Sequence, residues 1–336
     1  MDRCYLLVGP KRHGSKGYWL YDKLSKQYEV KTFFTRIDDT ENPSKYKVLT
    51  RTIANICYVR LHAKKKDLVL VYDNDTQCHY CGVLFVLTFS PIVIHKINAM
   101  AVNKDRLFSP IKRFFVKLAY KKIYTTVNNS EIAKTFQDFL GVKSEHFIPI
   151  PDSISDFGYD LKKITDRSDQ GYIFMGGATY RDYPMFVEIA RKYPQYQFVA
   201  VTFERFNKYF SHASSNVKVL FGLKELDFYQ VMAHSRLVFI PLTSDMQGGQ
   251  IVVMQAALLS KPIITTKTLA IDTYFSANSI YLINIGDIDT ACNYIEELME
   301  SPDIRKVMGA KANTDISRFS VDKIFKEYQS KLFSIK

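Results

Sequence analysis

Short apolar runs alternate with stretches of helical periodicity over most of the 336 residues. In the first half we predict strands at four of these runs, 5–8, 68–72, 91–94 and 122–126. In the second half we predict strands at 171–177, 196–201, 217–220, 237–242, 262–266 and 280–283. Strands that alternate with helices are typical of parallel, doubly wound sheets. The pattern therefore predicts the α/β class, with two Rossmann-like units.

The length favours two domains, because a single hydrophobic core rarely grows beyond about 300 residues. A segment with two prolines and several turn residues, 148–156, has the composition of a linker. We therefore place an N-terminal domain at 1–155 and a C-terminal domain at 156–319. The last segment, 320–336, has a helical pattern beyond the last predicted strand, and we expect a helix that can return to the N-terminal domain.

A glycine pair in the second half marks the most informative loop. Gly248 and Gly249 lie between the predicted strand 237–242 and a helical stretch that ends before the strand 262–266. Glycine lets the backbone approach a ligand closely, and a helix N-terminus presents unpaired N–H groups and the positive end of the helix dipole. The loop is therefore a candidate anion site.

The order of elements around this loop resembles GT-B glycosyltransferases of the retaining family 4 type. The resemblance covers residues 171–275 and extends to the N-terminal half in outline only. In that family, two glutamates separated by seven residues contact the donor, and here Gln247 and Gln255 stand at that separation. The resemblance implies a GT-B fold, in which two Rossmann-like doubly wound domains face a central cleft.

The resemblance also implies roles for these amides. Gln255 would contact the ribose of a nucleotide sugar, Gln247 would contact hydroxyls of the donor sugar, and Gln250 is a further candidate. A glutamine can donate to and accept from hydroxyls, but it has no charge and cannot act as a base. The alternative is that these are surface amides near a helix start. We expect the donor-binding residues to be Gly177, Arg181, Gly222, Leu223, Ser244, Gln247, Gly248, Gly249, Gln250 and Gln255.

A second departure from the family lies in residues 175–183, at the end of the strand predicted at 171–177. The family commonly has an arginine where this chain has Gly177, so Arg181 becomes the nearest cation. Its planar guanidinium suits phosphate oxygens and could stabilise a departing diphosphate. The alternative is a solvated arginine at a helix start. With Arg181 we take His13 and Gln247 as the catalytic candidates.

The first predicted strand ends in a loop, 9–17, with several glycines and cations. It lacks the residue order of a P-loop or of a dinucleotide-binding fingerprint. By resemblance it would lie near the acceptor, where His13 could serve as an acid, a base or a polar contact. The acceptor-side candidates are Gly9, Lys11, Arg12, His13, Gly14 and Asp73.

Charge is distributed unevenly along the chain. Residues 1–150 hold 25 Lys and Arg against 13 Asp and Glu, whereas the rest of the chain holds 21 of each. A basic half indicates an anionic partner. In the helical stretch 109–122, Ile111, Phe114, Phe115 and Leu118 form one face among several cations. This suits an anionic membrane surface, although a helix packed on a core has the same pattern.

Neither a metal site nor a membrane span is expected. Cys78 and Cys81 have half of a zinc-site spacing without a second pair, so we interpret them as buried thiols. The uncharged stretch 76–94 is interrupted by Pro91 and polar residues, which argues against a transmembrane helix. Five scattered cysteines without a signal peptide favour a reducing, cytoplasmic compartment.

Together these features predict a hexosyltransferase that uses a nucleotide diphosphate sugar as donor and needs no cofactor. The resemblance implies that it is retaining and metal-independent. The acceptor would be a glycan or a polyprenyl-pyrophosphate-linked glycan of bacterial surface polysaccharide synthesis, handled at the cytoplasmic face of the membrane. The alternatives are a sugar-nucleotide epimerase of the same fold, or a non-enzymatic module that binds anionic membranes or nucleic acid. No RNA-recognition or helix-turn-helix signature supports nucleic acid as a partner.

Overall fold

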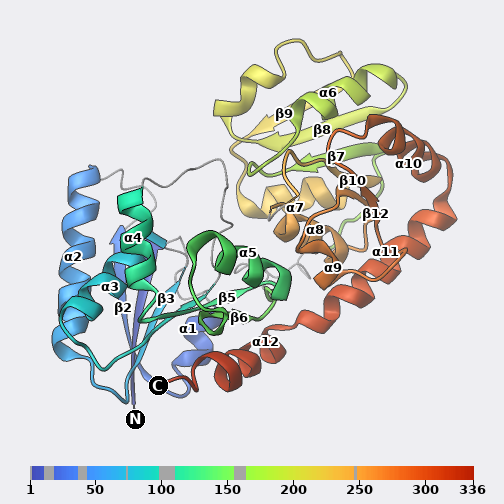
Figure 1. The fold of residues 1–336 in the computed structure, drawn as a ribbon. Helices are drawn as coiled ribbons and strands as arrows, with labels where there is room; N and C mark the ends of the chain where they lie inside the picture. Colours follow the sequence, from blue (N-terminus) through green and yellow to red (C-terminus); the bar gives the residue numbers. More distant parts are fainter. Residues whose placement is uncertain are drawn as a thin grey trace. The chain divides into compact units, whose positions relative to one another are not determined.

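The computed structural model describes residues 2–10, 19–36, 44–72, 75–97, 110–154, 164–245 and 248–336. The chain forms two compact units, one made of Met1–Gly158 with Ser320–Lys336 and the other of Tyr159–Phe319 (Figure 1). Within the described residues each unit contains a six-stranded sheet whose neighbouring strands are all parallel. The alternation of strands and helices in the sequence predicted this arrangement.

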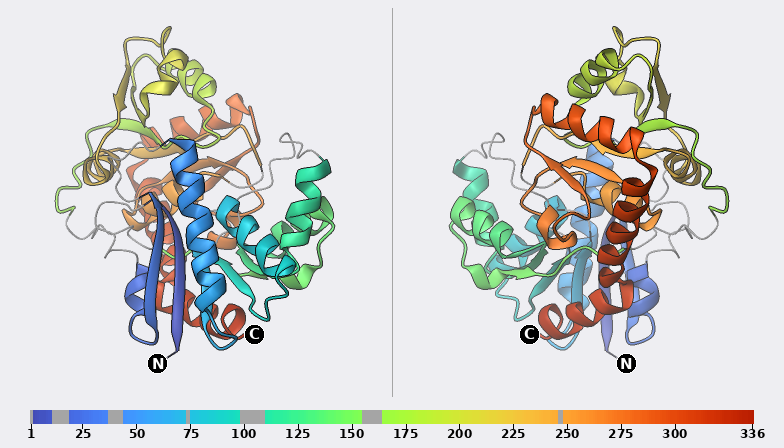
Figure 2. Two further views of the ribbon diagram at one scale, coloured as in Figure 1. Left: turned by 90° about the vertical axis from the view of Figure 1, so that its left-hand side faces the viewer. Right: turned by 90° about the vertical axis from the view of Figure 1, so that its right-hand side faces the viewer.

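The first unit has the strand order β2-β1-β3-β4-β5-β6. Its strands are β1 (Arg3–Pro10), β2 (Glu29–Arg36), β3 (Leu68–Tyr72), β4 (Ile94–Ile97), β5 (Ile123–Val127) and β6 (Phe147–Pro149). Its main helices are α1 (Trp19–Leu24), α2 (Lys45–His62), α3 (Asp75–Leu87), α4 (Pro110–Ala119) and α5 (Ser130–Leu140). The helices α2, α3 and α4 lie together on one face of the sheet (Figure 2).

The central strands of this sheet are apolar because helices cover both of its faces. Leu68, Val69, Leu70 and Val71 of β3 are all buried, and so are the residues from Cys4 to Val8 of β1. Continuous apolar runs of this kind are typical of strands buried on both sides. The buried strand predicted at 91–94 begins three residues later, since β4 spans Ile94–Ile97.

The C-terminal segment belongs to the first unit. Its helix α12 (Val321–Glu327) continues into a π-helical turn, Tyr328–Leu332. The Trp19 ring stacks on the Tyr328 ring with a centroid distance of 5.9 Å, and the Phe325 ring meets Trp19 edge-on at 6.5 Å. These aromatic contacts attach the end of the chain to α1.

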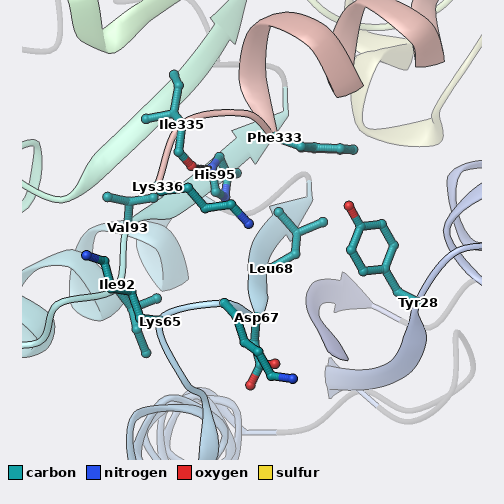
Figure 3. A pocket seen from close by; sticks show the side chains of 11 residues that line it. Tyr28, Lys65, Asp67, Leu68, Ile92, Val93, His95, Phe333, Ile335 and Lys336 are labelled. Carbon is teal, nitrogen blue, oxygen red and sulfur yellow. Dashed lines mark hydrogen bonds between the residues drawn. The ribbon is translucent and has the colours of Figure 1, made fainter. Parts of the chain in front are cut away.

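A small pocket lies where β3 begins, lined by Tyr28, Leu68, His95 and the chain end (Figure 3). The two ring nitrogens of His95 lie 3.3 Å from the Val69 carbonyl oxygen and 3.0 Å from that of Ile335. Burial lowers the pKa of His95 to about 4, so the ring is neutral at pH 7 and donates to one carbonyl at a time. His95 thus links β4 to the C-terminal segment.

The second unit has the strand order β12-β11-β10-β7-β8-β9. Its strands are β7 (Tyr172–Gly176), β8 (Gln197–Thr202), β9 (Val217–Phe221), β10 (Leu237–Ile240), β11 (Ile263–Thr266) and β12 (Tyr281–Ile283). Its helices are α6 (Tyr183–Lys192), α7 (Glu225–Ala233), α8 (Gln250–Leu258), α9 (Ile271–Tyr274), α10 (Ile288–Glu300) and α11 (Pro302–Ile316). The chain leaves β7 towards β8 and later returns to β10 on the other side, so the order reverses between β7 and β10.

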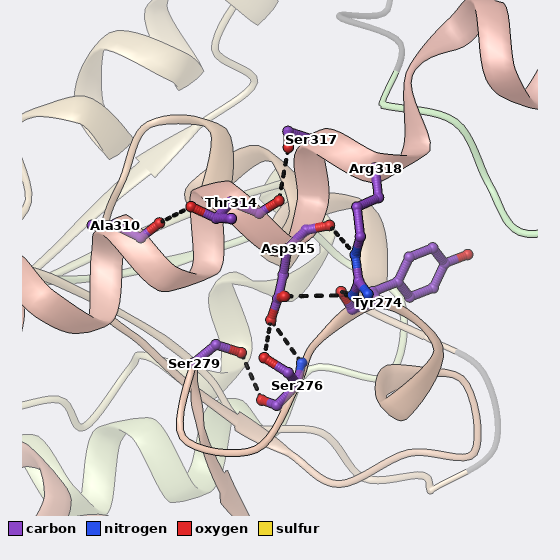
Figure 4. Close-up of polar contacts among 8 residues, drawn as sticks. All are labelled: Tyr274, Ser276, Ser279, Ala310, Thr314, Asp315, Ser317 and Arg318. Atoms are coloured by element: carbon purple, nitrogen blue, oxygen red, sulfur yellow. Dashed lines mark hydrogen bonds and ion pairs between the residues drawn. The ribbon is translucent and has the colours of Figure 1, made fainter.

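Helix α11 holds α8 and the loop after α9 in place. A Cβ on Gly309 would collide with the Ser260 carbonyl at the end of α8, so only glycine allows the two helices to approach this closely. Near the end of α11, the Asp315 carboxylate accepts hydrogen bonds from the Ser276 N–H (2.7 Å) and hydroxyl (2.6 Å), as Figure 4 shows. Burial alone would raise the pKa of Asp315, but these hydrogen bonds and nearby Arg318 outweigh it and lower the pKa.

Candidate active site

The loops after β7 and β10 are joined at the point where the strand order of the second sheet reverses. The Thr243 N–H donates to the Tyr180 carbonyl (2.9 Å), and the Asp182 N–H donates to the Pro241 carbonyl (2.9 Å). Arg181 and Leu242 form an isolated antiparallel bridge between the two loops. In open α/β sheets, ligands bind beyond the carboxyl ends of the strands at such a switch point.

The Arg181 guanidinium lies inside this junction. Arg181 is only 7% exposed, and its Nε donates to the Gly176 carbonyl (2.6 Å) while its Nη1 donates to the Thr179 carbonyl (2.8 Å). Burial lowers its pKa to about 10, so the group is charged at pH 7. Among the described residues no carboxylate lies close enough to Arg181 to raise its pKa. A buried cation without a carboxylate partner is available to a bound anion.

Two glycines border this guanidinium. Gly177 has φ of +97° and Gly249 has φ of +72°, in the left-handed region that favours glycine. A Cβ on Gly249 would lie 3.2 Å from Arg181 Nη1, and a Cβ on Gly177 would collide with Nη2. The space next to the Cα of Gly177 is therefore occupied by the Arg181 guanidinium.

Helix α8 begins at this same place. Gly249 is its N-cap and provides no side-chain hydrogen bond, and the first turn has no acidic residue. The free N–H groups and the dipole of α8 therefore add positive potential next to Arg181. The side-chain oxygen of Gln250 is buried and has no hydrogen-bond partner in the described part of the chain. A buried oxygen of this kind normally has a partner, and a ligand hydroxyl would supply one.

Gln255 faces helix α7. It is 7% exposed, and its Nε2 donates to the Tyr229 hydroxyl (2.8 Å), which in turn donates to Glu225 Oε1 (3.0 Å). Gln255 is therefore not a surface amide, and its NH2 group already has a protein partner. Sequence reasoning did not single out Glu225 or Tyr229. The signal that could have found Glu225 is its position at the start of a helix that follows Gly222 and Leu223 after a single residue, Lys224.

Residues of α6 and of the end of β8 lie next to the loop that follows β7. The Tyr183 hydroxyl lies 2.6 Å from Thr202 Oγ1, and both hydroxyls donate to the Gly177 carbonyl, at 3.0 and 3.1 Å. The Tyr183 ring stacks on Tyr209 with a centroid distance of 5.5 Å. Beyond β8, the Arg205 guanidinium lies 4.9 Å from the centroid of the Phe203 ring. None of these residues was predicted for the site from the sequence.

The other donor candidates follow the same edge of the sheet. Gly222 comes directly after β9 with φ of +61°, and a Cβ there would meet nothing within 4 Å. Leu223 and Ser244 are half-buried in the loops after β9 and β10. Gly248 lies under Tyr180, with 3.0 Å between its ideal Cβ position and Tyr180 Cδ2. Gln247 is outside the described residues.

In the first sheet the strand order reverses between β1 and β3, which are neighbours, and Val8 pairs with Tyr72. Gly9 is within β1, and Asp73 follows β3 in the sequence. The other acceptor-side candidates, Asp73, Lys11, Arg12, His13 and Gly14, are outside the described residues.

The two cysteines with half of a zinc-site spacing are buried thiols, as interpreted from the sequence. Cys78 and Cys81 are completely buried in α3, and burial raises the pKa of the Cys81 thiol, which opposes the thiolate form that binds metal. Across the described residues, no group of three His, Cys, Asp or Glu side chains could hold a metal ion. In that same part of the chain no helix is both long and apolar enough to span a membrane.

The chain was compared with known proteins. No protein-family model and no curated protein matches its sequence. Among solved structures it is similar to HepE from Anabaena in complex with UDP, with a TM-score of 0.72 and 15% identity over 99% of this chain and 100% of that one. It is also similar to the sucrose-phosphate synthase of Thermosynechococcus elongatus, with a TM-score of 0.73 and 11% identity over 100% of both chains. The chain has the GT-B fold.

The similar solved structures also include a protein that is named for a different reaction, epimerisation. A putative UDP-N-acetylglucosamine 2-epimerase from Listeria monocytogenes matches with a TM-score of 0.64 and 12% identity over 100% of this chain and 98% of that one. The predicted fold class is therefore confirmed. Likeness at this level of identity defines the fold, and the reaction must be argued from the site.

Proposed function

We propose that this chain transfers a hexosyl group from a nucleotide diphosphate sugar to an acceptor. The observation that carries the proposal is Arg181, a buried cation without a carboxylate partner among the described residues, beside the N-terminus of α8 and two glycines with positive φ. An anion with two phosphates would meet the guanidinium and the helix N–H groups at once. The titles of similar structures name UDP and UDP-glucose as bound ligands, which supports a nucleotide sugar as the donor.

The proposed chemistry places most of the charge stabilisation on the leaving group. When the bond between the anomeric carbon and the diphosphate breaks, negative charge develops on the diphosphate oxygens. Arg181 and the N–H groups of α8 are fixed before the reaction and stabilise that charge as it forms. We propose that the reaction retains the anomeric configuration and needs no metal, as the resemblance to family 4 implies.

The positions of Gln250 and Gln255 support their proposed roles. Gln250 offers a buried oxygen to a sugar or ribose hydroxyl. Gln255 contributes its remaining acceptor capacity to the ribose and is fixed by Tyr229. Gln247 is proposed to contact the donor sugar, and His13 to contact the acceptor.

We further propose that the acceptor is a glycan or a lipid-linked glycan of bacterial surface polysaccharide synthesis. The excess of Lys and Arg in residues 1–150 supports an acceptor or a surface that carries negative charge. The proposed location is the cytoplasmic side of the membrane, with the protein bound at its surface. We propose no nucleic-acid partner and no cofactor.

A thermal shift screen with UDP, GDP, ADP and CMP sugars tests the donor. A ligand present at 100 times its dissociation constant stabilises the native state by about 2.7 kcal/mol. We expect one nucleotide class to raise the melting temperature of the wild type and to lose this effect in the Arg181→Met variant. The absence of a shift with all four classes would contradict the proposal.

The donor that gives the shift also separates transfer from epimerisation. We expect slow release of the nucleoside diphosphate when the donor is incubated with the protein, and faster release with an acceptor glycan. A donor whose sugar is inverted at one carbon without release of the nucleotide would instead show an epimerase.

A further inference from the structure

Helix α4 presents its largest apolar side chains outwards. Ile111 is 72% exposed, Phe114 63% and Phe115 47%. The sequence pattern grouped these residues as one face together with Leu118, and such a face normally packs on the core. In the structure the core contacts of α4 are made by Val116 and Ala119 instead. The three largest side chains of this face therefore remain unburied.

The packing of α3 on α4 explains this orientation. A Cβ on Gly82 of α3 would lie only 2.8 Å from the Ala119 Cβ, so the two helices approach closely at two small residues. This close approach turns the C-terminal half of α4 inwards. The first turns of α4, which carry Ile111, Phe114 and Phe115, are left exposed.

The N-terminal part of α2 has the same character. Tyr46 is 76% exposed and Leu49 41%, and Ile53 one turn later is also exposed. In a parallel α/β sheet the helices run opposite to the strands, so both helices begin at the carboxyl edge of the sheet. Figures 1 and 2 show the N-terminal ends of α2 and α4 at the same edge. We call residues 45–53 and 110–117 together the α2–α4 edge.

Positive charge accompanies these apolar side chains. Helix α2 contains four Lys and Arg and α4 contains three, and neither helix contains an Asp or Glu. Helix stability alone favours acidic residues at an N-terminus, because the dipole is positive there. Lys45 and Lys47 in α2, and Lys112 and Arg113 in α4, occupy the first turns against this preference. Such an arrangement concentrates positive charge at the start of both helices.

We propose that the α2–α4 edge docks on the surface of an anionic lipid bilayer. Exposed aliphatic and aromatic side chains enter the boundary between headgroups and acyl chains, while the surrounding cations meet the headgroups. Ile111 and Leu49 favour a bilayer over a nucleic acid, since aliphatic side chains offer no ring on which a base could stack. This inference deepens the proposed membrane location and rests on it, but vesicle binding is measured without any sugar donor.

Co-sedimentation of the full chain with vesicles tests the proposal. We expect the wild type to bind phosphatidylcholine vesicles that contain phosphatidylglycerol, to bind pure phosphatidylcholine weakly, and to dissociate as salt increases. In the K112Q/R113Q variant the loss of two cations should weaken binding by roughly 30-fold. The F114S/F115S variant should bind the vesicles more weakly than the wild type, and added salt should abolish its remaining binding.

A matched control lies on α11 of the second unit. Lys306 is exposed and Val307 is 54% exposed, so K306Q/V307S removes one cation and one exposed apolar side chain outside the proposed edge. This control should bind vesicles as the wild type does. Circular dichroism melts would identify any variant that fails to fold. Because Lys112 and Arg113 are exposed, K112Q/R113Q should fold and tests the docking proposal even if F114S/F115S does not.

Three results would overturn the docking proposal. These are equal binding to neutral and anionic vesicles, unchanged binding by both α4 variants, or binding of RNA but not of vesicles by the wild type. The nucleotide-sugar thermal shift should be the same in the α4 variants and in the wild type. Vesicle binding without any nucleotide shift would leave the docking proposal standing and contradict the proposed function.

Discussion

Replacement of Arg181 by methionine should remove nucleotide binding without unfolding the second unit. In the structure the guanidinium donates two hydrogen bonds to backbone carbonyls, those of Gly176 and Thr179. Each hydrogen bond from a charged group contributes about 1.5–3 kcal/mol to stability. Methionine loses both bonds but also removes a buried charge that has no carboxylate partner among the described residues, and such a charge costs several kcal/mol.

These two effects have opposite signs and similar size. We therefore expect the free energy of unfolding of Arg181→Met to lie within about 2 kcal/mol of the wild-type value. Binding of a nucleoside diphosphate has no such compensation, because a charge-assisted, two-pronged contact to phosphate is lost. The affinity should fall by at least about 30-fold, which corresponds to about 2 kcal/mol.

Isothermal titration with UDP, GDP and ADP measures the affinity, and urea unfolding measures the stability. Arg191→Met is the matched control, since Arg191 is an exposed arginine at the end of α6. It should bind the nucleotide as the wild type does. An Arg181→Met protein that remains folded and binds the same nucleotide with unchanged affinity would refute the assignment of Arg181 to the anion site.

Three further substitutions test other parts of the structure. Gly249→Ala places a Cβ at a residue with φ of +72°, 3.2 Å from Arg181 Nη1, and should cost about 1 kcal/mol of stability and weaken nucleotide binding in titrations; equal affinity would contradict this. Burial lowers the pKa of Lys261 from 10.5 to about 8, so the unfolded chain binds the proton more tightly and wild-type stability should rise between pH 8 and 10.5. The free energy of unfolding of Lys261→Met, measured with urea, should lack this rise. A pH profile identical to that of the wild type would contradict the assignment of the rise to Lys261. The lowered pKa of Asp315 gives stability that is present above the ordinary Asp pKa of 3.8 and is lost as the pH falls through the lower folded value. Asp315→Asn should therefore have a lower melting temperature than the wild type at neutral pH, and its melting temperature should fall less as the pH is lowered. Melting temperatures that fall equally with pH in both proteins would contradict this prediction.

Much of the fold could be predicted from the sequence because buried parallel strands are continuous apolar runs. The strand at 68–72 was predicted with the bounds that β3 has, and the other predicted strands differ from the structure by a few residues. The strands β2 and β6 were not predicted. Both are at the edges of the first sheet, and β2 (Glu29–Arg36) alternates polar and apolar residues, so neither forms an apolar run.

The site was predictable only in part. Glycines and a helix start leave a clear signature, so the loop at Gly248 and Gly249 was found. The burial of Arg181 depends on backbone pairing between the loops after β7 and β10, which no local pattern reveals. The contact of Gln255 with Tyr229 likewise depends on how α7 packs beside α8.

The sequence left open whether the apolar face of α4 packs on the core, and in the structure three of its side chains are exposed. A helical wheel groups Ile111, Phe114 and Phe115, but it does not show which face packs on α3. The small residues Gly82 and Ala119 decide that contact. Such pairings join residues that are far apart in the sequence, and they are visible only in the folded chain.

A crystal structure with the nucleoside diphosphate that gives the largest thermal shift tests the central claim most directly. We predict that diphosphate oxygens lie within 2.7–3.1 Å of the Arg181 guanidinium and of N–H groups at the start of α8. A diphosphate bound elsewhere, with Arg181 still bonded only to Gly176 and Thr179, would contradict the account.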